Sequence, residues 1–473
     1  MFDREAGEAC GVFGAFSTDP QIQKDLPYIA LKGLEVMQHR GQEAAGIVVG
    51  GDDGLRRHVG PGRVSEVFSD AESLKKLGIG KIVSAHVRYG TISTRDPNEA
   101  GGPVLRDRFA VAHNGHWQDE LLDELGIKRD GRTDTERAAD YIASLISTAE
   151  PMENTLTRAL RDLHEGAFSL VVTTRDQLFA VRDPHGFRPL VLGRFTGGYA
   201  VASETIALDV NGIPVIREID PGEMLVIDDR GFRPAKPFSP VVEPRENLCA
   251  FELGYFSAPA SRIKDREVYS YRRALGEELA IQDRDFIAQS KPDLVIGVPD
   301  SGIPAAEGYQ RASGIPISSG MMKNRYPGRT FIAPGNSDRP AAVRKKLFVY
   351  REEVEGKSLV VIDDSIVRGT TTRELVNMLF EAGAREVHLR STMPPYRHGC
   401  HMGMDTGDES KLIAARHGGN TEAIRAEINA TTLDFLRLPA MVKALGSHGV
   451  GLCTACMDGD YPIKIRSKQA ARA

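Results

Sequence analysis

One stretch of the sequence, residues 359–371, restricts the possible folds more than any other. It opens with an apolar run typical of a buried strand, Leu-Val-Val-Ile, which ends in two adjacent carboxylates, Asp363 and Asp364. A loop rich in hydroxyl groups and glycine follows and leads into a helix that we expect over residues 371–382. Backbone N–H groups at the start of a helix form a cradle for an anion. The stretch therefore predicts a phosphate-binding loop at the end of a strand.

Taken alone, these residues have two interpretations. Asp and Ser are common at helix N-caps, so the stretch could be no more than a strand end followed by a capped helix. In the functional interpretation, the loop residues Ser365, Gly369, Thr370 and Thr371 bind a phosphate group. The paired carboxylates would then hold a ribose diol and Mg²⁺, because such hard cations prefer oxygen ligands.

The segments around this loop alternate between strand and helix. Residues 293–298, 358–362 and 386–390 have the composition of buried strands, and residues 304–312 have the apolar spacing of a helix. Strand, loop, helix and strand in succession predict a parallel α/β sheet in the second half of the chain.

The first half has a different pattern. Short strand-like segments follow one another closely, separated by turn residues, and three longer stretches have helical spacing. The expected strands cover 44–49, 81–89, 167–172, 178–181, 189–192, 199–202 and 223–227, and the expected helices cover 21–37, 133–148 and 154–164. Two sheets with helices outside them fit this pattern. A proline-rich stretch, 234–244, is interpreted as the linker between the halves.

Read with its surroundings, the phosphate loop resembles the 5-phosphoribosyl-1-pyrophosphate (PRPP) loop of type I phosphoribosyltransferases. Residues 323–332 and 343–347 resemble the flexible loop and the pyrophosphate-contacting segment of glutamine PRPP amidotransferases, and the resemblance extends from Cys10 to Pro462. It implies an α+β N-terminal-nucleophile glutaminase domain, an αββα sandwich, followed by an α/β phosphoribosyltransferase domain with a parallel sheet. The implied boundaries are a propeptide over 1–9, the glutaminase domain over 10–235, the phosphoribosyltransferase domain over 245–440 and a tail over 441–473.

By the same resemblance, residues outside the loop contact PRPP or its metal. Lys323, Arg344 and Lys346 would bind its phosphate groups, and Ser301 would join the paired carboxylates around Mg²⁺. Glutamine and PRPP are the implied substrates, and purine nucleotides are the implied feedback inhibitors. The resemblance also implies a homotetramer or homodimer.

Cys10 stands in Cys-Gly-Val-Phe-Gly, the sequence that opens the mature protein in the resembled family. A thiol that attacks an amide needs a base, and a free α-amine on the same residue supplies one in position. While Ala9 is attached, that nitrogen is an amide and cannot act as a base. The alternative is a buried structural thiol, the usual fate of a free cysteine. The accompanying motifs 38–42, 86–89 and 113–115 favour the nucleophile.

The resemblance to N-terminal-nucleophile glutamine amidotransferases assigns further roles. Asn114 and the N–H of Gly115 would form the oxyanion hole, and preorganised donors at such a site usually make the largest catalytic contribution. Arg88 would hold the α-carboxylate of glutamine as a bidentate partner. Asp134 would hold the α-ammonium, and its position also suits a helix N-cap.

The other four cysteines are Cys249, Cys400, Cys453 and Cys456. They match the cysteines that hold a [4Fe–4S] cluster in one branch of the resembled family, and four thiolates are what such a cluster needs. Spacing alone does not distinguish iron–sulfur from zinc. Two disulfides are the remaining alternative, and they do not suit a reducing compartment. The expected role of the cluster is to join the tail and the linker to the second domain.

Composition excludes several classes of protein. The net charge of −5 argues against a nucleic-acid-binding surface. No apolar run approaches the roughly 20 residues that span a bilayer, and the acidic, polar N-terminus is not a secretory signal. Only 5 cysteines in 473 residues indicate a cytoplasmic protein, for which we expect neither a nucleic-acid nor a membrane partner.

Several positions depart from the resembled family, mostly around the glutamine site and the domain junction. They are Gly90–Ser93, His116 in place of the usual Asn, Gly102, His185 and Ala258–Ser261, while Pro327 replaces a Val in the flexible loop. These changes concern glutaminase efficiency and coupling between the domains more than phosphoribosyl transfer.

The predicted function is the transfer of glutamine-derived ammonia to PRPP, the first step of purine (IMP) biosynthesis. The products would be 5-phosphoribosylamine, glutamate and pyrophosphate. One alternative is a non-catalytic paralogue that senses PRPP or nucleotides, and another is an amidotransferase for a different sugar phosphate. The intact Cys10, Asn114 and paired carboxylates argue against the first alternative, and the PRPP loop argues against the second.

Overall fold

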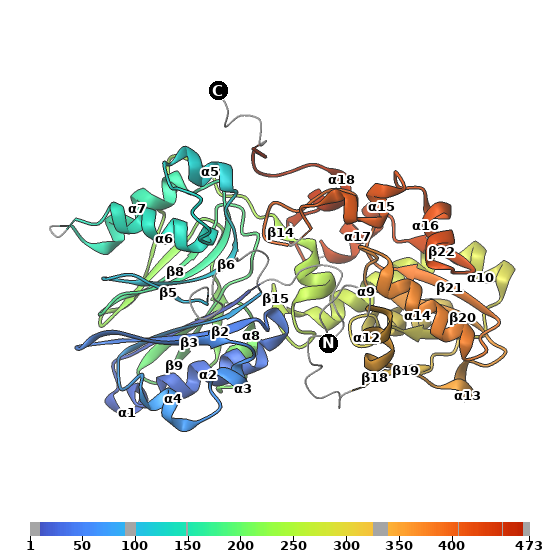
Figure 1. Ribbon diagram of the computed structural model, residues 1–473, viewed down its shortest axis with the longest axis horizontal. Coiled ribbons are helices and arrows are strands. Elements are labelled where there is room, and N and C mark those ends of the chain that lie inside the picture. Colours follow the sequence, from blue (N-terminus) through green and yellow to red (C-terminus); the bar gives the residue numbers. More distant parts are fainter. Residues whose placement is uncertain are drawn as a thin grey trace.

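The structure is a computed structural model that describes residues 10–89, 101–147, 150–324, 339–404, 406–446 and 448–466. Figure 1 shows two lobes side by side, the first built from the blue to green segments and the second from the yellow to red ones. The short strands β14 (Leu248–Cys249) and β15 (Arg262–Ile263) lie between them. Within the described ranges, no helix has the length and apolar character needed to cross a membrane.

The first lobe contains two antiparallel sheets. The larger has the strand order β11 (Val215–Glu218), β9 (Val191–Phe195), β10 (Gly198–Ala202), β1 (Gly11–Ser17), β4 (Ile82–Arg88), β2 (Ala44–Gly51) and β3 (Gly54–Pro61). The smaller has the order β13 (Gly231–Ala235), β12 (Met224–Asp228), β8 (Leu178–Arg182), β7 (Ala167–Thr173), β6 (Ala110–His116) and β5 (Val104–Leu105).

Helices cover the outer face of each sheet. Those on the side of the larger sheet are α1 (Pro20–Gln23), α2 (Leu26–Val36), α3 (Val64–Val67), α4 (Ala71–Lys75) and α8 (Thr205–Asp209). Those on the side of the smaller sheet are α5 (Asp119–Glu124), α6 (Asp134–Ser144) and α7 (Met152–Asp162). A short 3₁₀ turn, η1 (Gln38–Arg40), follows α2.

The residues of β1 explain why this layering forms. Successive side chains of a strand point to opposite faces. Val12 and Phe16 therefore enter the core between the two sheets, whereas Phe13 and Ala15 enter the core beneath α2. Because both faces are covered, all of β1 is buried and its sequence is a continuous apolar run. The resulting αββα sandwich confirms the fold class predicted for the first half.

The second lobe is built on a parallel sheet with the order β17 (Leu294–Gly297), β20 (Ser358–Asp363), β21 (Glu386–Ser391) and β22 (Thr432–Phe435). Packed against one face are α9 (Val268–Gln282), α10 (Arg284–Ser290), α11 (Ile303–Ser313) and α17 (Leu438–Leu445). Packed against the other are α12 (Arg339–Lys346), α13 (Arg351–Val354), α14 (Thr370–Glu381), α15 (Ile413–Arg416) and α16 (Thr421–Ile428). This arrangement confirms the parallel α/β sheet predicted for the second half.

Smaller elements complete this lobe and its junction with the first. Strand β18 (Met321–Lys323) pairs with β19 (Leu347–Val349), β14 with β23 (Leu452–Cys453), and β15 with β16 (Arg266–Glu267). A π-helix, η2 (Glu252–Phe256), follows β14, and η4 (Glu409–Lys411) and α18 (Ala455–Asp458) lie near the C-terminal end.

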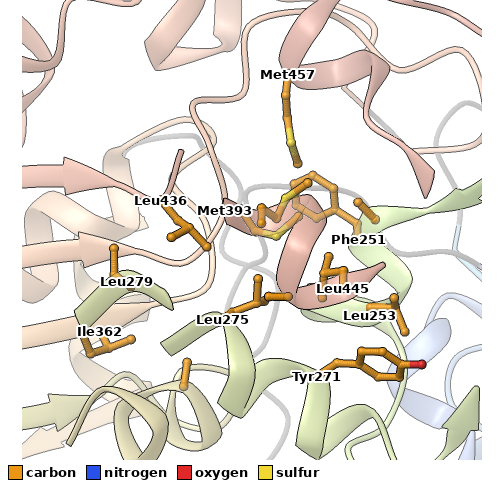
Figure 2. Packing of buried hydrophobic residues seen from close by; sticks show 14 of the residues in the cluster. Phe251, Leu253, Tyr271, Leu275, Leu279, Ile362, Met393, Leu436, Leu445 and Met457 are labelled. Carbon is orange, nitrogen blue, oxygen red and sulfur yellow. The ribbon is translucent and has the colours of Figure 1, made fainter. Parts of the chain in front are cut away.

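One apolar cluster joins the beginning and the end of the second lobe. Figure 2 shows Phe251, Leu253 and Leu275, from the light-green segment, directed toward Met393 and Leu445, from the orange and red segments. All five are fully buried. Because apolar burial is the main favourable contribution to folding, this cluster holds the junction segment and the C-terminal region in one body.

Three predicted elements differ from the observed ones, and one of them, the helix expected over 133–148, already ends at Ser144. The helix expected over 21–37 is broken into α1 and α2, because Pro27 has no N–H to continue a helix and instead occupies the first turn of α2. The strand expected over 189–192 begins only at Val191. The domain boundaries at 235, 245 and 440 stay a prediction.

Candidate functional site

A pocket in the first lobe collects most of the residues predicted to handle glutamine. Cys10, Arg88, Gly115 and Asp134 all line it. Cys10 precedes β1, Arg88 ends β4, Gly115 lies in β6 and Asp134 begins α6, so four separate elements meet at this point. Asn114 is the neighbour of Gly115 in β6 and does not itself line the pocket.

Cys10 is partly buried and its thiol is not spontaneously ionised. Burial raises the pKa of Cys10, and a backbone hydrogen bond from Tyr89 and the charges of Arg88 and Arg40 only partly offset this effect. A thiol with a raised pKa needs a base to become a nucleophile at neutral pH.

Two imidazoles near the thiol are poor candidates for this base. Burial lowers the pKa of His86 to about 3 and that of His113 to about 4. A general base is most effective when its pKa lies near the working pH. His86 Nε2 also faces the carbonyl oxygen of His113 at 2.9 Å and must donate to it. The pocket residues are therefore compatible with the predicted α-amine of Cys10 as the base.

The oxyanion side of the pocket is tightly packed. Gly115 has φ +147°, and a Cβ at this position would lie 1.9 Å from the carbonyl oxygen of Ala167, so no larger residue fits. The side chain of Asn114 is fully buried, and neither its Nδ2 nor its Oδ1 has a hydrogen-bond partner among the described residues. A buried amide without a partner is costly in a folded protein. It is consistent with a donor that is held ready for a substrate.

Asp134 accepts hydrogen bonds on both of its oxygens. His116 Nδ1 lies 3.1 Å from Oδ2, and the N–H of Trp117 donates to the same oxygen at 3.0 Å. Thr135 N donates to Oδ1 at 2.8 Å. Burial opposes the charge of Asp134, yet these hydrogen bonds and the nearby imidazoles hold its pKa well below the ordinary value. The N-cap of α6 is Thr133, not Asp134, so the predicted capping role of Asp134 is wrong.

The second lobe supplies one wall of this pocket. Cys400, Gly403, Met404 and Gly407 line it from the loop between β21 and η4. Gly403 has φ +102°, and a Cβ there would lie 3.0 Å from the carbonyl carbon of Gly115. The loop thus lies directly against the predicted oxyanion hole.

A buried ion network connects this loop to the nucleophile. Arg188 Nη2 donates to the carbonyl oxygen of Met402 at 2.7 Å, and its Nη1 donates to Glu252 at 3.1 Å. Arg40 donates to Glu252 at 2.7 Å, to Glu204 at 2.6 Å and, through Nε, to the carbonyl oxygen of Cys10 at 3.0 Å. The two arginines and two glutamates are each at most 2 % exposed.

The predicted phosphate loop has the expected local structure. β20 ends at Asp363, the loop follows, and α14 begins at Thr370 directly after Gly369. Ser365 Oγ donates to Asp364 Oδ1 at 2.7 Å, and Asp364 N donates to Asp363 Oδ1 at 2.9 Å. The carboxylates therefore lie at the carboxyl end of a central parallel strand, where open α/β sheets bind their ligands.

The basic residues predicted to contact PRPP have hydrogen-bond or ion-pair partners within the second lobe. Lys323 donates to Asp300 at 2.8 Å, beside Ser301. Arg344 is paired with Glu374 and Glu381 on α14. The carbonyl oxygen of Lys346 accepts a hydrogen bond from Asn324 N at 2.8 Å, which joins the ends of the two segments.

Part of one predicted segment, residues 325–332 with Pro327, lies outside the described residues, as does the departure at Gly90–Ser93. Lys323 and Asn324, at the start of the flexible loop, lie within them.

The four remaining cysteines approach one another. Cys249 and Cys453 are register partners in the parallel pair of β14 and β23. Burial raises the pKa of Cys456, and so do the negative potentials of Cys249, Cys400 and Cys453. Burial likewise raises the pKa of Cys249 to about 11, although the charge of Arg188 opposes this. Within the described ranges, no three His, Cys, Asp or Glu side chains form a group that could hold a metal ion.

Comparisons with known proteins agree with this geometry. A family model for a glutamine amidotransferase domain matches residues 90–210. An amidophosphoribosyltransferase of Bacillus subtilis is 40 % identical over 97 % of this chain and 95 % of its own length. Amidophosphoribosyltransferase 1, chloroplastic, of Arabidopsis thaliana is 42 % identical over 98 % of this chain and 80 % of its own length.

A solved structure is similar over almost the whole chain. Glutamine PRPP amidotransferase from B. subtilis, complexed with ADP and GMP, superposes with a TM-score of 0.84. It is 40 % identical and covers 97 % of this chain and 98 % of its own.

The sequence alone gives no role to several residues of the pocket and of the ion network. It marks His116 only as a departure from the family, and nothing in it singles out Arg188, Glu204 or Glu252. Arg40 lies in the motif 38–42, which is the one sequence signal that points to the ion network.

Proposed function

The chain belongs to the amidophosphoribosyltransferase family, and we propose that it transfers ammonia from glutamine to PRPP in two linked sites. The products would be 5-phosphoribosylamine, glutamate and pyrophosphate, and the reaction is the first step of purine biosynthesis. One observation carries the proposal. One lobe of the chain contains the thiol of Cys10 in a pocket, and the other contains the paired carboxylates Asp363 and Asp364 at the start of the phosphate loop.

In the first site, the thiol of Cys10 attacks the carboxamide carbon of glutamine. The α-amine that is free once residues 1–9 are removed takes the thiol proton and then delivers it to the departing ammonia. Asn114 Nδ2 and the N–H of Gly115 stabilise the oxyanion. Arg88 binds the α-carboxylate of the substrate and Asp134 its α-ammonium, and water then hydrolyses the thioester to glutamate.

In the second site, ammonia displaces pyrophosphate from C1 of the ribose. Ser365 and the residues Gly369, Thr370 and Thr371 at the start of α14 bind the 5-phosphate, because N–H groups at a helix start attract anions. Lys323, Arg344 and Lys346 are proposed for the pyrophosphate. For Arg344 this requires release from Glu374 and Glu381, to which it is paired.

The second site has suitable ligands for Mg²⁺. Asp363 and Asp364 present two carboxylates at one strand end, and Mg²⁺ commonly takes one or two carboxylates together with substrate phosphates. Ser301 would add a hydroxyl. When bound, the ion neutralises charge on the pyrophosphate that leaves.

For the four cysteines we propose a [4Fe–4S] cluster as a structural element. Their mutual electrostatic influence and burial support a four-thiolate site. Among the described residues, no group of three His, Cys, Asp or Glu side chains is placed to hold a metal ion, so the proposal rests on the burial and mutual influence of these thiols. Cys249, Cys400, Cys453 and Cys456 would hold it and so join the junction, the pocket loop and the tail.

Regulation and assembly complete the proposal. The B. subtilis structure with ADP and GMP supports purine nucleotides as inhibitors of this chain as well. A homotetramer or homodimer is proposed from family membership alone. A non-catalytic sensor would have no use for the amide of Asn114, which lacks a hydrogen-bond partner in the described part of the chain and lies beside a thiol pocket.

Replacing the nucleophile tests the proposal. Cys10→Ala should abolish glutamine-dependent synthesis of 5-phosphoribosylamine and leave ammonia-dependent synthesis within about twofold of wild type, because the phosphate loop lies in the other lobe. The mass of the intact chain, measured alongside, tells whether residues 1–9 have been removed. Equal loss of both activities in a folded Cys10→Ala protein would contradict the two-site division.

A further inference from the structure

His116 lies in the glutamine pocket beside Asp134, the residue predicted to bind the α-ammonium of glutamine. It is the last residue of β6, two positions after Asn114, and its side chain is 41 % exposed on the pocket side. Its Nδ1 is 3.1 Å from Asp134 Oδ2. The two side chains therefore form an ion pair whenever the imidazole is protonated.

Asp134 has no spare acceptor for a substrate ammonium. A carboxylate offers about four lone-pair positions. Trp117 N and His116 Nδ1 occupy Oδ2, while Thr135 N at 2.8 Å and Thr135 Oγ1 at 3.4 Å occupy Oδ1. The two backbone N–H groups are fixed directly after β6 and in α6. An ammonium group that binds Asp134 must therefore displace either the Thr135 hydroxyl or His116.

Of these two groups, only the imidazole of His116 can lose a positive charge when the ammonium binds. The hydroxyl of Thr135 is also held by His113 Nδ1 at 2.8 Å, whereas the imidazole of His116 makes no hydrogen bond among the described residues other than that with Asp134. Two cations cannot share one carboxylate without repulsion.

We propose that His116 exchanges its proton for the α-ammonium of glutamine, so that the glutamine site is complete only when this imidazole is neutral. On binding, the ammonium takes the place of the Nδ1–H on Asp134 Oδ2, and the proton leaves to solvent. The neutral Nδ1 then accepts a hydrogen bond from the same ammonium. One proton is released for each glutamine bound. This inference rests on the proposed glutaminase function of the pocket.

The charges around His116 favour the protonated form in the free protein. Burial opposes it, but the hydrogen bond and charge of Asp134, together with Asp119 and Glu120 on α5, raise the pKa of His116. Two other imidazoles face it, His113 on β6 and His401 on the pocket loop. Burial lowers the pKa of both, so neither gains a proton in the same pH range.

The direction of the pH effect follows from these charges. In the free protein the pKa of His116 is raised, and the bound ammonium lowers it again by replacing the favourable partner. Glutamine affinity should be fully present above the pKa of the free protein. Below it, affinity should fall by about tenfold per pH unit, the slope for one coupled proton. Asp134 keeps its charge throughout, because its own pKa is held low.

The experiment is a pH series on the full chain with saturating PRPP and Mg²⁺. The KM for glutamine is measured between about pH 5.5 and 8, where glutamine keeps its ammonium charge, for wild type and His116→Asn. Wild type should show a KM that rises toward acid, and His116→Asn a KM that is nearly constant. Ammonia-dependent synthesis at matched concentrations of free ammonia should have the same pH profile in both proteins.

Calorimetry provides a second measurement that does not depend on activity. Glutamine is titrated into Cys10→Ala in two buffers of different ionisation enthalpy, about one pH unit below the pKa found for the wild-type KM profile, where most of the free protein carries the His116 proton. The difference should give close to one proton released, and Cys10→Ala/His116→Asn should release none.

Two results would overturn the proposal: a wild-type KM that does not change over this range, or the same slope in His116→Asn. Buried Asp183, whose pKa burial raises to about 6, would give a slope that survives in His116→Asn. If wild type hydrolyses no glutamine and Cys10→Ala binds none at any pH, the proposed function of the pocket fails as well.

Discussion

Removing the charge of Glu252 should destabilise the protein strongly. Glu252 is fully buried and accepts four hydrogen bonds, two from Arg40, one from Arg188 and one from Ser257. Glu252→Gln keeps the shape of the side chain. It replaces one acceptor oxygen with an NH₂ that faces guanidinium donors.

The magnitude follows from the charges of the network. Arg40 and Arg188 balance Glu204 and Glu252, so the variant leaves one buried positive charge without compensation. Breaking a buried ion pair by removing one partner costs about 3–5 kcal/mol. Because the glutamine retains one oxygen acceptor, we expect the lower end, a loss of about 3 kcal/mol in the free energy of unfolding.

Urea unfolding followed by fluorescence measures this loss. The chain has 1 tryptophan, Trp117, which is 1 % exposed and packs against His113 with ring centroids 4.3 Å apart. It therefore reports on the lobe that contains both arginines. The matched control is Glu72→Gln, whose partner Lys75 is 3.0 Å away on the surface of α4. That exposed pair should contribute less than about 0.5 kcal/mol.

The reasoning would be refuted if Glu252→Gln unfolded within about 1 kcal/mol of wild type with an unchanged denaturant slope. Such a result would mean that water or movement of the π-helix compensates the charge, and that the network is not the connection between the lobes that its geometry indicates.

Three further changes have distinct expected outcomes. Asp364→Asn should weaken PRPP binding by about 1.5–3 kcal/mol and lower both the glutamine- and the ammonia-dependent activity, because a hydrogen-bonded charge is lost; unchanged PRPP affinity in a binding assay would remove Asp364 from the site. Gly403→Ala should lower glutaminase kcat/KM by about tenfold or more and leave ammonia-dependent synthesis intact, because the new methyl group lies 3.0 Å from the carbonyl carbon of Gly115 and the backbone has φ +102°. The control is Gly407→Ala, whose new methyl group has no atom within 4 Å and should leave the glutaminase kcat/KM unchanged. Anaerobically purified protein should contain about four irons per chain, Cys453→Ser should lose both the iron and solubility while Cys10→Ala retains both, and zinc in place of iron by elemental analysis would contradict the cluster.

Local sequence patterns were sufficient for much of the fold. The strand, carboxylate pair and helix at 358–382 were predicted within one residue, since apolar runs and helix starts are encoded by neighbouring residues. Pro27 shows how a single residue limits prediction from apolar spacing. The helical spacing over 21–37 continues through Pro27, but a proline has no N–H with which the backbone could continue the helix.

The site was predictable only where chemistry restricts residue choice. Cys10, Asn114 and Asp134 belong to short motifs whose reactive groups suggest a role. Arg40 and Glu252 are 212 residues apart, and nothing in either neighbourhood marks them as partners. Charged residues are rarely fully buried, so sequence reasoning places both on the surface by default.

The pairing of β14 with β23 has a consequence for the order in which the chain is made. Cys10 leaves the ribosome first, and the loop that forms the opposite wall of its pocket follows about 390 residues later, roughly 20–80 seconds at ordinary rates of synthesis. β23, which pairs with β14, comes later still. The nascent first lobe can fold its two sheets during this interval, but its nucleophile then faces solvent where the loop will lie. The glutaminase pocket of a nascent chain is thus incomplete until the pocket loop and β23 have been synthesised.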